Sequence, residues 1–293
     1  MLYPDFNELL DLQHKVKRLS VNQDRSSANI SGDNRSKRYG SGLEFEEVRE
    51  YVMGDDVRNI DWRVTARTNI PHSKLFKVQS EQTINIVVDM NANMHFGTKS
   101  TFKSVQAARL ASLLSWFFNQ GNNKVGGVIF GGEGNVELFP PAKSKQSLLR
   151  MLQSLCLQKI SKEYTPLDHA LSKLGRMVSS ESRIYIISDF SNFNYKSILK
   201  DIKRFRERGC NISFLQIIDQ RDYDIPAIGQ ISFVDMVGND IEIDSSNKSG
   251  NRKYLELWEN NQEQLCKLTN EVGIKLTRIN TNDDVFLKLM SSL

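Results

Sequence analysis

The run INIVVD, residues 84–89, decides the fold class, because it is a short apolar stretch that ends at a carboxylate. Comparable runs recur along the chain, and a segment with helical periodicity separates each from the next. These runs are KVGGVIF (124–130), RIYIIS (183–188) and NISFLQII (211–218). Apolar strands that alternate with helices are typical of α/β proteins. We therefore predict a doubly wound, mostly parallel sheet of the Rossmann type, with helices on both faces.

The chain is expected to divide into an N-terminal extension and one large domain. Residues 1–73 are predicted to hold a helix, a polar loop and a dense block of Arg, Asp and Glu. Residues 74–293 are predicted to form the α/β domain. Within that domain, two short strands around Gly238 and Asn239 predict a hairpin insertion at about residues 228–245. A chain of 293 residues is long enough to bury a full core of this kind.

The charge and cysteine content argue against several classes of protein. A net charge of +4 arises from 39 basic and 35 acidic residues, which is too balanced to indicate a nucleic-acid binder. The three cysteines have no paired or metal-ligand spacing, which favours a reducing compartment. No stretch approaches the ~20 apolar residues of a membrane helix, and the first residues lack the apolar core of a signal peptide. We therefore expect a cytoplasmic protein with no nucleic-acid partner and no membrane insertion.

Polar side chains gather at three places where the predicted strands and loops end. Asp89, Asn91 and Asn93 alternate directly after the first strand, Thr165 follows a later loop, and Asp189 follows a later strand. In parallel sheets, ligands bind outside the carboxyl ends of the strands. Oxygen-bearing side chains suit hard cations such as magnesium. On local sequence alone, the same residue types more often make turns and helix caps. Their occurrence at three separate ends weakens that alternative and makes this a candidate metal site.

The order of these residues resembles the metal-ion-dependent adhesion site of von Willebrand factor A domains. That site has the pattern Asp-x-Ser-x-Ser, a Thr from a later loop and an Asp after the fourth strand. The resemblance implies a metal site formed by Asp89, Asn91, Asn93, Thr165 and Asp189, with Mg²⁺ or Mn²⁺ as the cation. Asn stands here at both Ser positions, and its longer side chain reaches further into the site. We therefore expect a degenerate site that binds the cation weakly or not at all.

The charged block EFEEVREYVMGDDVRNIDWRVTAR, residues 44–67, carries a second and more specific resemblance. It is similar to the signature of the bacterial family known as domain of unknown function fifty-eight. The resemblance covers about residues 40–219. It implies a von Willebrand factor A-like domain and a partner, an AAA+ ATPase of the MoxR type.

Basic and acidic residues cancel within the block, which argues against a phosphate-binding stripe. Two other roles stay open. Arg–carboxylate pairs, with Trp62 as an apolar anchor, would fix the block against the α/β domain, or the block would dock a partner. The candidate residues are Arg49, Asp55, Arg58, Asp61, Trp62 and Arg67. We favour the structural role for all of them except Arg67.

Motifs of several enzyme classes are absent from the sequence. It has no nucleotide-binding P-loop, no paired-histidine zinc motif and no G-x-S-x-G. We therefore predict a non-catalytic adaptor that recognises an unknown target protein, while the ATPase supplies the energy. The alternative is a metal-dependent hydrolase or phosphatase, since carboxylates at strand ends with magnesium also describe such enzymes. Such an enzyme needs a nucleophile or a general base near the metal. Asn residues occupy two of the positions where such a group would act, which disfavours the alternative.

Overall fold

The structure is a computed structural model in which the chain forms two compact units. One unit consists of Met1–Arg25 and Gln82–Leu293, and we call it the α/β unit. The other unit, Ser26–Glu81, contains the charged block, and we call it the charged unit. The structure describes residues 2–26, 43–78, 81–99, 101–120, 123–132, 135–161, 163–224, 229–234, 240–244 and 248–290.

A six-stranded sheet forms the centre of the α/β unit, in the order β10-β7-β6-β3-β4-β5. Neighbouring strands are parallel, except that the edge strand β5 runs antiparallel to β4. The strands are β3 (Thr83–Asp89), β4 (Lys124–Phe130), β5 (Val136–Ala142), β6 (Arg183–Ser188), β7 (Asn211–Ile218) and β10 (Lys275–Asn280). The predicted fold class, α/β with a mostly parallel sheet, is confirmed. The parallel strands end at one common edge, which is where such sheets bind ligands.

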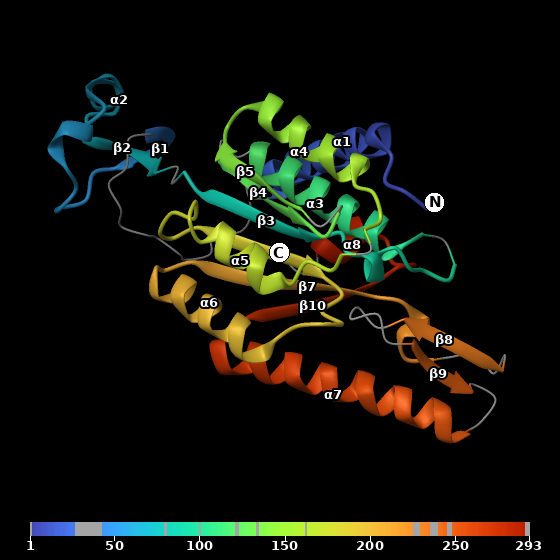
Figure 1. The fold of residues 1–293 in the computed structure, drawn as a ribbon. Helices are drawn as coiled ribbons and strands as arrows, with labels where there is room; N and C mark the ends of the chain where they lie inside the picture. The colour runs from blue at the N-terminus through green and yellow to red at the C-terminus, as the bar shows by residue number, and fades with distance from the viewer. Residues whose placement is uncertain are drawn as a thin grey trace. The chain divides into compact units, whose positions relative to one another are not determined.

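Helices cover both faces of this sheet (Figure 1). Ile86 and Val88 of β3 belong to the core formed with α1, α3, α4 and α8, whereas Val87 belongs to the core formed with α5, α6 and α7. Successive strand residues point to opposite faces, so a strand covered on both faces is apolar throughout. The helices are α1 (Phe6–Ser26), α3 (Lys103–Gln120), α4 (Lys145–Leu157), α5 (Leu167–Leu174), α6 (Tyr195–Glu207), α7 (Lys248–Val272) and α8 (Val285–Met290).

The N-terminal helix α1 packs into the α/β unit, so the division of the chain differs from the predicted boundary after residue 73. Leu9, Leu12 and Val16 are buried in the core beside α3. Their spacing of three and four residues places them on one face of the helix. The carbonyl oxygen of Leu9 accepts hydrogen bonds from Ser112 Oγ at 2.7 Å and Trp116 Nε1 at 3.0 Å. The helix was predicted, but its attachment to the domain core was not.

A hairpin forms where the sequence predicted one. Strands β8 (Gln230–Val234) and β9 (Asp240–Asp244) are antiparallel. The predicted turn at Gly238 and Asn239 lies outside the described residues. In the parts of the chain that the structure describes, no helix is both long and apolar enough to cross a lipid bilayer.

The charged unit is built on a two-stranded antiparallel sheet of β1 (Leu43–Glu50) and β2 (His72–Val78). A 3-10 turn, η2 (Val57–Asn59), and a short helix, α2 (Trp62–Thr68), lie between the two strands in sequence. Strand β1 was not predicted, because the segment is rich in Glu, which is depleted in strands. Pairing with β2 overrides that local preference.

Candidate functional site

The five predicted site residues come together at the carboxyl ends of β3 and β6. Asp89 is the last residue of β3, and Asp189 directly follows β6, the strand paired with β3. Asn91 and Asn93 lie in the turn after β3, and Thr165 lies two residues before α5. All except Asn93 are buried. We call these five residues, together with Ser188 and Lys103, the strand-end cluster.

Both carboxylate oxygens of Asp89 accept hydrogen bonds from the protein. Oδ1 accepts from the Asn91 amide nitrogen at 2.9 Å and from Asn91 Nδ2 at 2.8 Å. Oδ2 accepts from Ser188 Oγ at 2.6 Å. Burial, followed by the negative charge of Asp189, raises the pKa of Asp89 to about 7. Sequence reasoning missed Ser188, although its position as the last strand residue places its hydroxyl at the same edge.

Asn91 uses both ends of its side-chain amide to join two loops. Its Oδ1 accepts from the Thr165 amide nitrogen at 2.9 Å, and its Nδ2 donates to the Thr165 carbonyl oxygen at 3.0 Å. Gly131 makes room for this arrangement, since a Cβ there would lie 2.3 Å from the Asn91 nitrogen. Gly131 also has a φ of 100°, in the region that glycine adopts most readily. Asn91 therefore links the turn after β3 to the loop before α5.

Asn93 contacts the second carboxylate of the cluster. Its Nδ2 donates to Asp189 Oδ1 at 2.7 Å and to Ser191 Oγ at 3.0 Å. The same Asp189 oxygen accepts from the Ser191 amide nitrogen at 3.0 Å. Asn93 Oδ1 is buried and has no hydrogen-bond partner. Among the side-chain oxygens of Asp89, Asn91, Asn93 and Asp189, this is the one left unpaired.

The remaining oxygen of Asp189 is held by a lysine that sequence analysis did not select. Lys103 Nζ lies 3.2 Å from Asp189 Oδ2 and 2.7 Å from Asp222 Oδ1, and only 3% of the residue is exposed. Burial alone would lower the pKa of Lys103, but the charges of the two carboxylates outweigh it and raise the pKa above its ordinary value. Burial would likewise raise the pKa of Asp189, and the Lys103 charge instead holds it low. Lys103 is thus a buried, charged partner of both carboxylates.

These contacts do not suit the divalent cation that the sequence pattern implies. Mg²⁺ prefers near-octahedral coordination by oxygen atoms. The oxygens of Asp89 and Asp189 already accept hydrogen bonds, the Asn91 amide is used at both ends, and an ammonium group is bonded to Asp189. Among the side-chain oxygens of Asp89, Asn91, Asn93 and Asp189, only Asn93 Oδ1 has no hydrogen-bond partner. Within the described residues, no group of three or more His, Cys, Asp or Glu side chains could hold a metal ion.

In the charged unit, three of the predicted residues make local contacts. Arg49 Nη2 lies 2.7 Å from Asp55 Oδ1, and Asp55 Oδ2 accepts from the Val52 amide nitrogen at 3.1 Å. Asp61 caps α2 by accepting from the amides of Arg63 at 3.0 Å and Val64 at 3.2 Å. These bonds, with that of Val64 foremost, lower the pKa of Asp61. The three acidic and basic side chains therefore shape the turns of their own unit.

Arg58, Trp62 and Arg67 are exposed. Trp62 was expected to be an apolar anchor, yet 70% of it is exposed. The reason is that α2 has seven residues and none of them is buried, so its first residue has no core to enter. Arg58 contributes its backbone amide to the cap at Asp56, 2.9 Å from the carboxylate.

Comparison with known proteins decides the family. Residues 47–264 match the family described as Protein of unknown function DUF58. The chain belongs to this family. The resemblance predicted from the charged block is thereby confirmed, and the match runs from that block through most of the α/β unit.

Relatives of this DUF58 protein include uncharacterized proteins of Mycobacterium bovis and Mycobacterium tuberculosis. Each is 30% identical over 209 residues, which cover 70% of this chain and 64% of the relative. The chain therefore spans less than two thirds of the length of these relatives.

Two solved structures are similar to this DUF58 protein. A conserved hypothetical protein, BatB, from Bacteroides thetaiotaomicron is 20% identical, with a TM-score of 0.45; the match covers 72% of this chain and 95% of that one. An aerotolerance-related membrane protein from Bacteroides fragilis is 19% identical, with a TM-score of 0.42; the match covers 71% and 96%.

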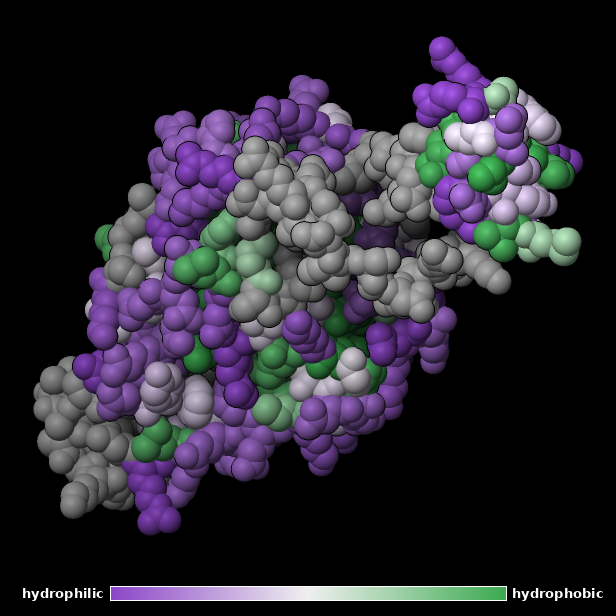
Figure 2. Space-filling model, turned by 180° about the vertical axis from the view of Figure 1, so that it is seen from behind, coloured by the Kyte–Doolittle hydropathy of each residue, from purple (hydrophilic) through white to green (hydrophobic). Residues whose placement is uncertain are grey.

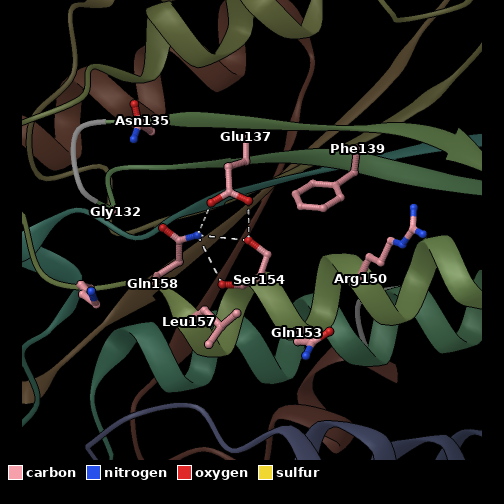
Figure 3. A pocket seen from close by; sticks show the side chains of 10 residues that line it. Gly132, Asn135, Glu137, Phe139, Arg150, Gln153, Ser154, Leu157 and Gln158 are labelled. Carbon is pink, nitrogen blue, oxygen red and sulfur yellow. Dashed lines mark hydrogen bonds between the residues drawn. The ribbon is translucent and has the colours of Figure 1, made fainter.

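Two pockets of this DUF58 protein lie in the α/β unit. The larger, about 390 Å³, lies between β5 and α4 (Figure 3). Its central polar groups satisfy one another, since Glu137 accepts from Ser154 Oγ at 2.6 Å and from Gln158 Nε2 at 2.8 Å. The other, about 230 Å³, opens beside the strand-end cluster, and Lys103 and Asp189 line it together with Trp258 of α7. Of the strand-end cluster, Lys103 and Asp189 line this second pocket.

Proposed function

We propose that this DUF58 protein is a non-catalytic adaptor that acts in the cytoplasm. It binds a MoxR-type AAA+ ATPase and an unknown target protein, and serves complex assembly or chaperone-like maturation. The ATPase supplies the energy, and this chain supplies recognition. The family resemblance supports the choice of partner. The observation that carries the adaptor role is the set of large apolar side chains exposed on the charged unit.

These side chains lie in the short stretch that links β1 to β2. The exposed fractions are 53% for Val52, 97% for Met53, 62% for Val57, 70% for Trp62 and 46% for Ile70. Figure 2 shows hydrophobic side chains at the surface of this unit. Concentrated apolar exposure is typical of protein-binding surfaces, and Trp is enriched among the residues that dominate binding energy. We therefore assign the partner-binding role to this stretch, which we call the apolar docking stretch.

The strand-end cluster supports a non-catalytic role. A general base or nucleophile must come within hydrogen-bonding reach of its substrate. Asp89 is 4% exposed and Asp189 is 5% exposed, and both are fully engaged by neighbouring donors. A hydrolase would have to break this network before each turnover. The alternative, a metal-dependent phosphatase, is tested by assaying p-nitrophenyl phosphate with Mg²⁺ or Mn²⁺; turnover that disappears in Asp89→Asn would favour it.

The adaptor role is tested with the full chain and a purified MoxR-type ATPase from the same genome. We expect binding in solution that Trp62→Ala weakens by at least about tenfold. Leu287→Ala is the matched control, because Leu287 is 66% exposed but lies on α8 in the α/β unit. Equal binding by the wild type and both variants would remove the docking stretch from the interface. Absence of binding by the wild type would reject this ATPase as the partner.

A further inference from the structure

Lys103 occupies a position that is costly for a lysine. It is the first residue of α3, where the helix dipole is positive and a cation is disfavoured. It is also almost fully buried, which is rare for lysine unless the charge is paired. Two carboxylates compensate, one from the loop after β6 and one from the 3-10 turn after β7. Such an arrangement indicates that the positive charge is required at this point.

Lys103 contacts one carboxylate of the strand-end cluster, Asp189, and one carboxylate outside it, Asp222. Asp189 Oδ2 and Asp222 Oδ1 are both within hydrogen-bonding distance of the single Nζ atom. Asn93, whose Oδ1 is unpaired, is bonded through its Nδ2 to the other oxygen of Asp189. The ammonium group therefore lies beside Asp189, one of the predicted cation ligands, and beside Asp222.

We propose that the ammonium group of Lys103 takes the place of a divalent cation at the strand-end cluster. The cluster is then complete without metal: the lysine neutralises Asp189 and Asp222, and Asn91 holds the Thr165 loop directly. If the proposed adaptor function holds, partner binding by this protein is independent of Mg²⁺ and Mn²⁺. The assignment of Lys103 itself does not depend on that function, because it rests on contacts within the chain.

The proposal predicts that removing the lysine creates a cation site. Lys103→Ala would leave the buried carboxylate of Asp189 and the half-buried carboxylate of Asp222 facing an emptied volume, with Asn93 Oδ1 in the same cluster. The 230 Å³ pocket lined by Lys103 and Asp222 gives a cation access to that volume. Carboxylate and amide oxygens are suitable ligands for Mn²⁺ and Mg²⁺. The Lys103→Ala variant should therefore bind a divalent cation that the wild type does not bind.

The experiment is a titration of metal-free full-length protein with MnCl₂, followed by electron paramagnetic resonance of free Mn²⁺ and by thermal melting. We expect no saturable binding by the wild type, and the same melting midpoint in chelator as in millimolar Mn²⁺. Lys103→Ala should melt lower in chelator, bind about one Mn²⁺, and recover part of the lost midpoint when Mn²⁺ is added. Lys103→Ala combined with Asp189→Asn should lose that binding.

Two outcomes would overturn the proposal. One-site Mn²⁺ binding by the wild type that disappears in Asp89→Ala would mean that the cluster is a metal site despite Lys103. A folded Lys103→Ala protein with no Mn²⁺ binding would mean that the lysine does not stand in for a cation. If Lys103→Ala does not fold, the wild-type titration still decides whether the intact cluster binds Mn²⁺. Neither measurement involves the ATPase, so failure here is distinct from failure of the adaptor role.

Discussion

The charged unit and the strand-end cluster contain similar residue types, but they use them in opposite ways. In the charged unit, Asp55 and Asp61 form caps and pairs close to solvent, while Trp62 is 70% exposed. In the strand-end cluster, Asp89 and Lys103 are buried, and their polar atoms bond to other parts of the chain. The difference shows that charge density alone does not locate a binding surface. Burial separates side chains that hold the fold from those that remain free to meet a partner.

The residues of the candidate metal site form an internal hydrogen-bond network, whereas part of the charged block exposes apolar side chains. Surface ion pairs contribute little to stability, whereas a buried charge that loses its partner is strongly destabilising. The two regions should therefore respond very differently to substitution.

The largest effect is expected for Lys103→Met. The substitution leaves Asp189 and Asp222 without their shared cation, and we expect it to lower the free energy of unfolding by about 3–5 kcal/mol. Urea unfolding followed by circular dichroism measures the change. Lys196→Met is the control, since Lys196 is exposed in the first turn of α6, and we expect a change within about 0.5 kcal/mol. Equal effects would contradict the structural importance of the buried ammonium.

A smaller effect is expected for Asp219→Asn. This buried carboxylate follows β7 and accepts from Thr281 Oγ1 at 2.5 Å and Thr98 Oγ1 at 2.7 Å, so it ties together the loops after β10 and β3. We expect a loss of about 2 kcal/mol at pH 7, since one acceptor becomes a donor. Asp224→Asn is the control, because the Asp224 side chain is 55% exposed.

The same Asp219 variant has a defined pH dependence. Burial would raise the pKa of Asp219, but hydrogen bonds from Thr281 and Thr98 outweigh it and hold the pKa below its ordinary value. A carboxylate with a lowered pKa stabilises the folded state above its unfolded pKa of about 3.9 and loses that contribution as pH falls through the folded value. The difference between the wild type and Asp219→Asn should therefore shrink below about pH 4. A constant difference from pH 7 to pH 3 would show that the charge of Asp219 is not what stabilises the loops.

Sequence patterns located the sheet and the place of the cluster, for physical reasons. A strand buried on both faces must be apolar throughout, which made β3, β4, β6 and β7 recognisable. Parallel strands end at one edge of the sheet. Because Asp89 and Asp189 each lie at the end of such a strand, the sequence predicted that they lie close together. The pairing of Lys103 with Asp222 joins residues 119 positions apart, and no local pattern reports such a contact. One signal was available: Lys103 lies on the same face of α3 as Ala107 and Leu110, where a lone charge needs a partner.

Asn91 illustrates a different limit. Its position in the pattern was recognised, and its greater length was expected to reach into the site. The amide instead turns to Thr165 and bonds to its backbone at 2.9 and 3.0 Å. The sequence identifies the residue, but the direction of its side chain depends on where another loop places its backbone groups.

In the charged unit, the cap at Asp61 should have a moderate effect. Replacing an N-cap Asp with Ala costs about 1 kcal/mol in typical helices, and Asp61 also lies 3.5 Å from Lys74 Nζ. We expect Asp61→Ala to increase amide hydrogen exchange within Trp62–Thr68 while the six-stranded sheet exchanges as in the wild type. Arg58→Ala is the matched variant from the same unit, and its exposed side chain should leave exchange in α2 unchanged. Faster exchange in both variants would restore a structural role to Arg58.

The smallest effect on stability is expected for Trp62→Ala, which the sequence analysis placed among the structural residues. Because 70% of Trp62 is exposed and no residue of α2 is buried, its removal uncovers little apolar surface. We expect the free energy of unfolding to change by no more than about 0.5 kcal/mol, although the same variant should lose ATPase binding. Differential scanning calorimetry of the full chain measures the first quantity. A loss above about 2 kcal/mol would mean that Trp62 is covered within the folded chain. The apolar docking stretch would then stabilise the fold, as the strand-end cluster does, and would not serve as a partner-binding surface.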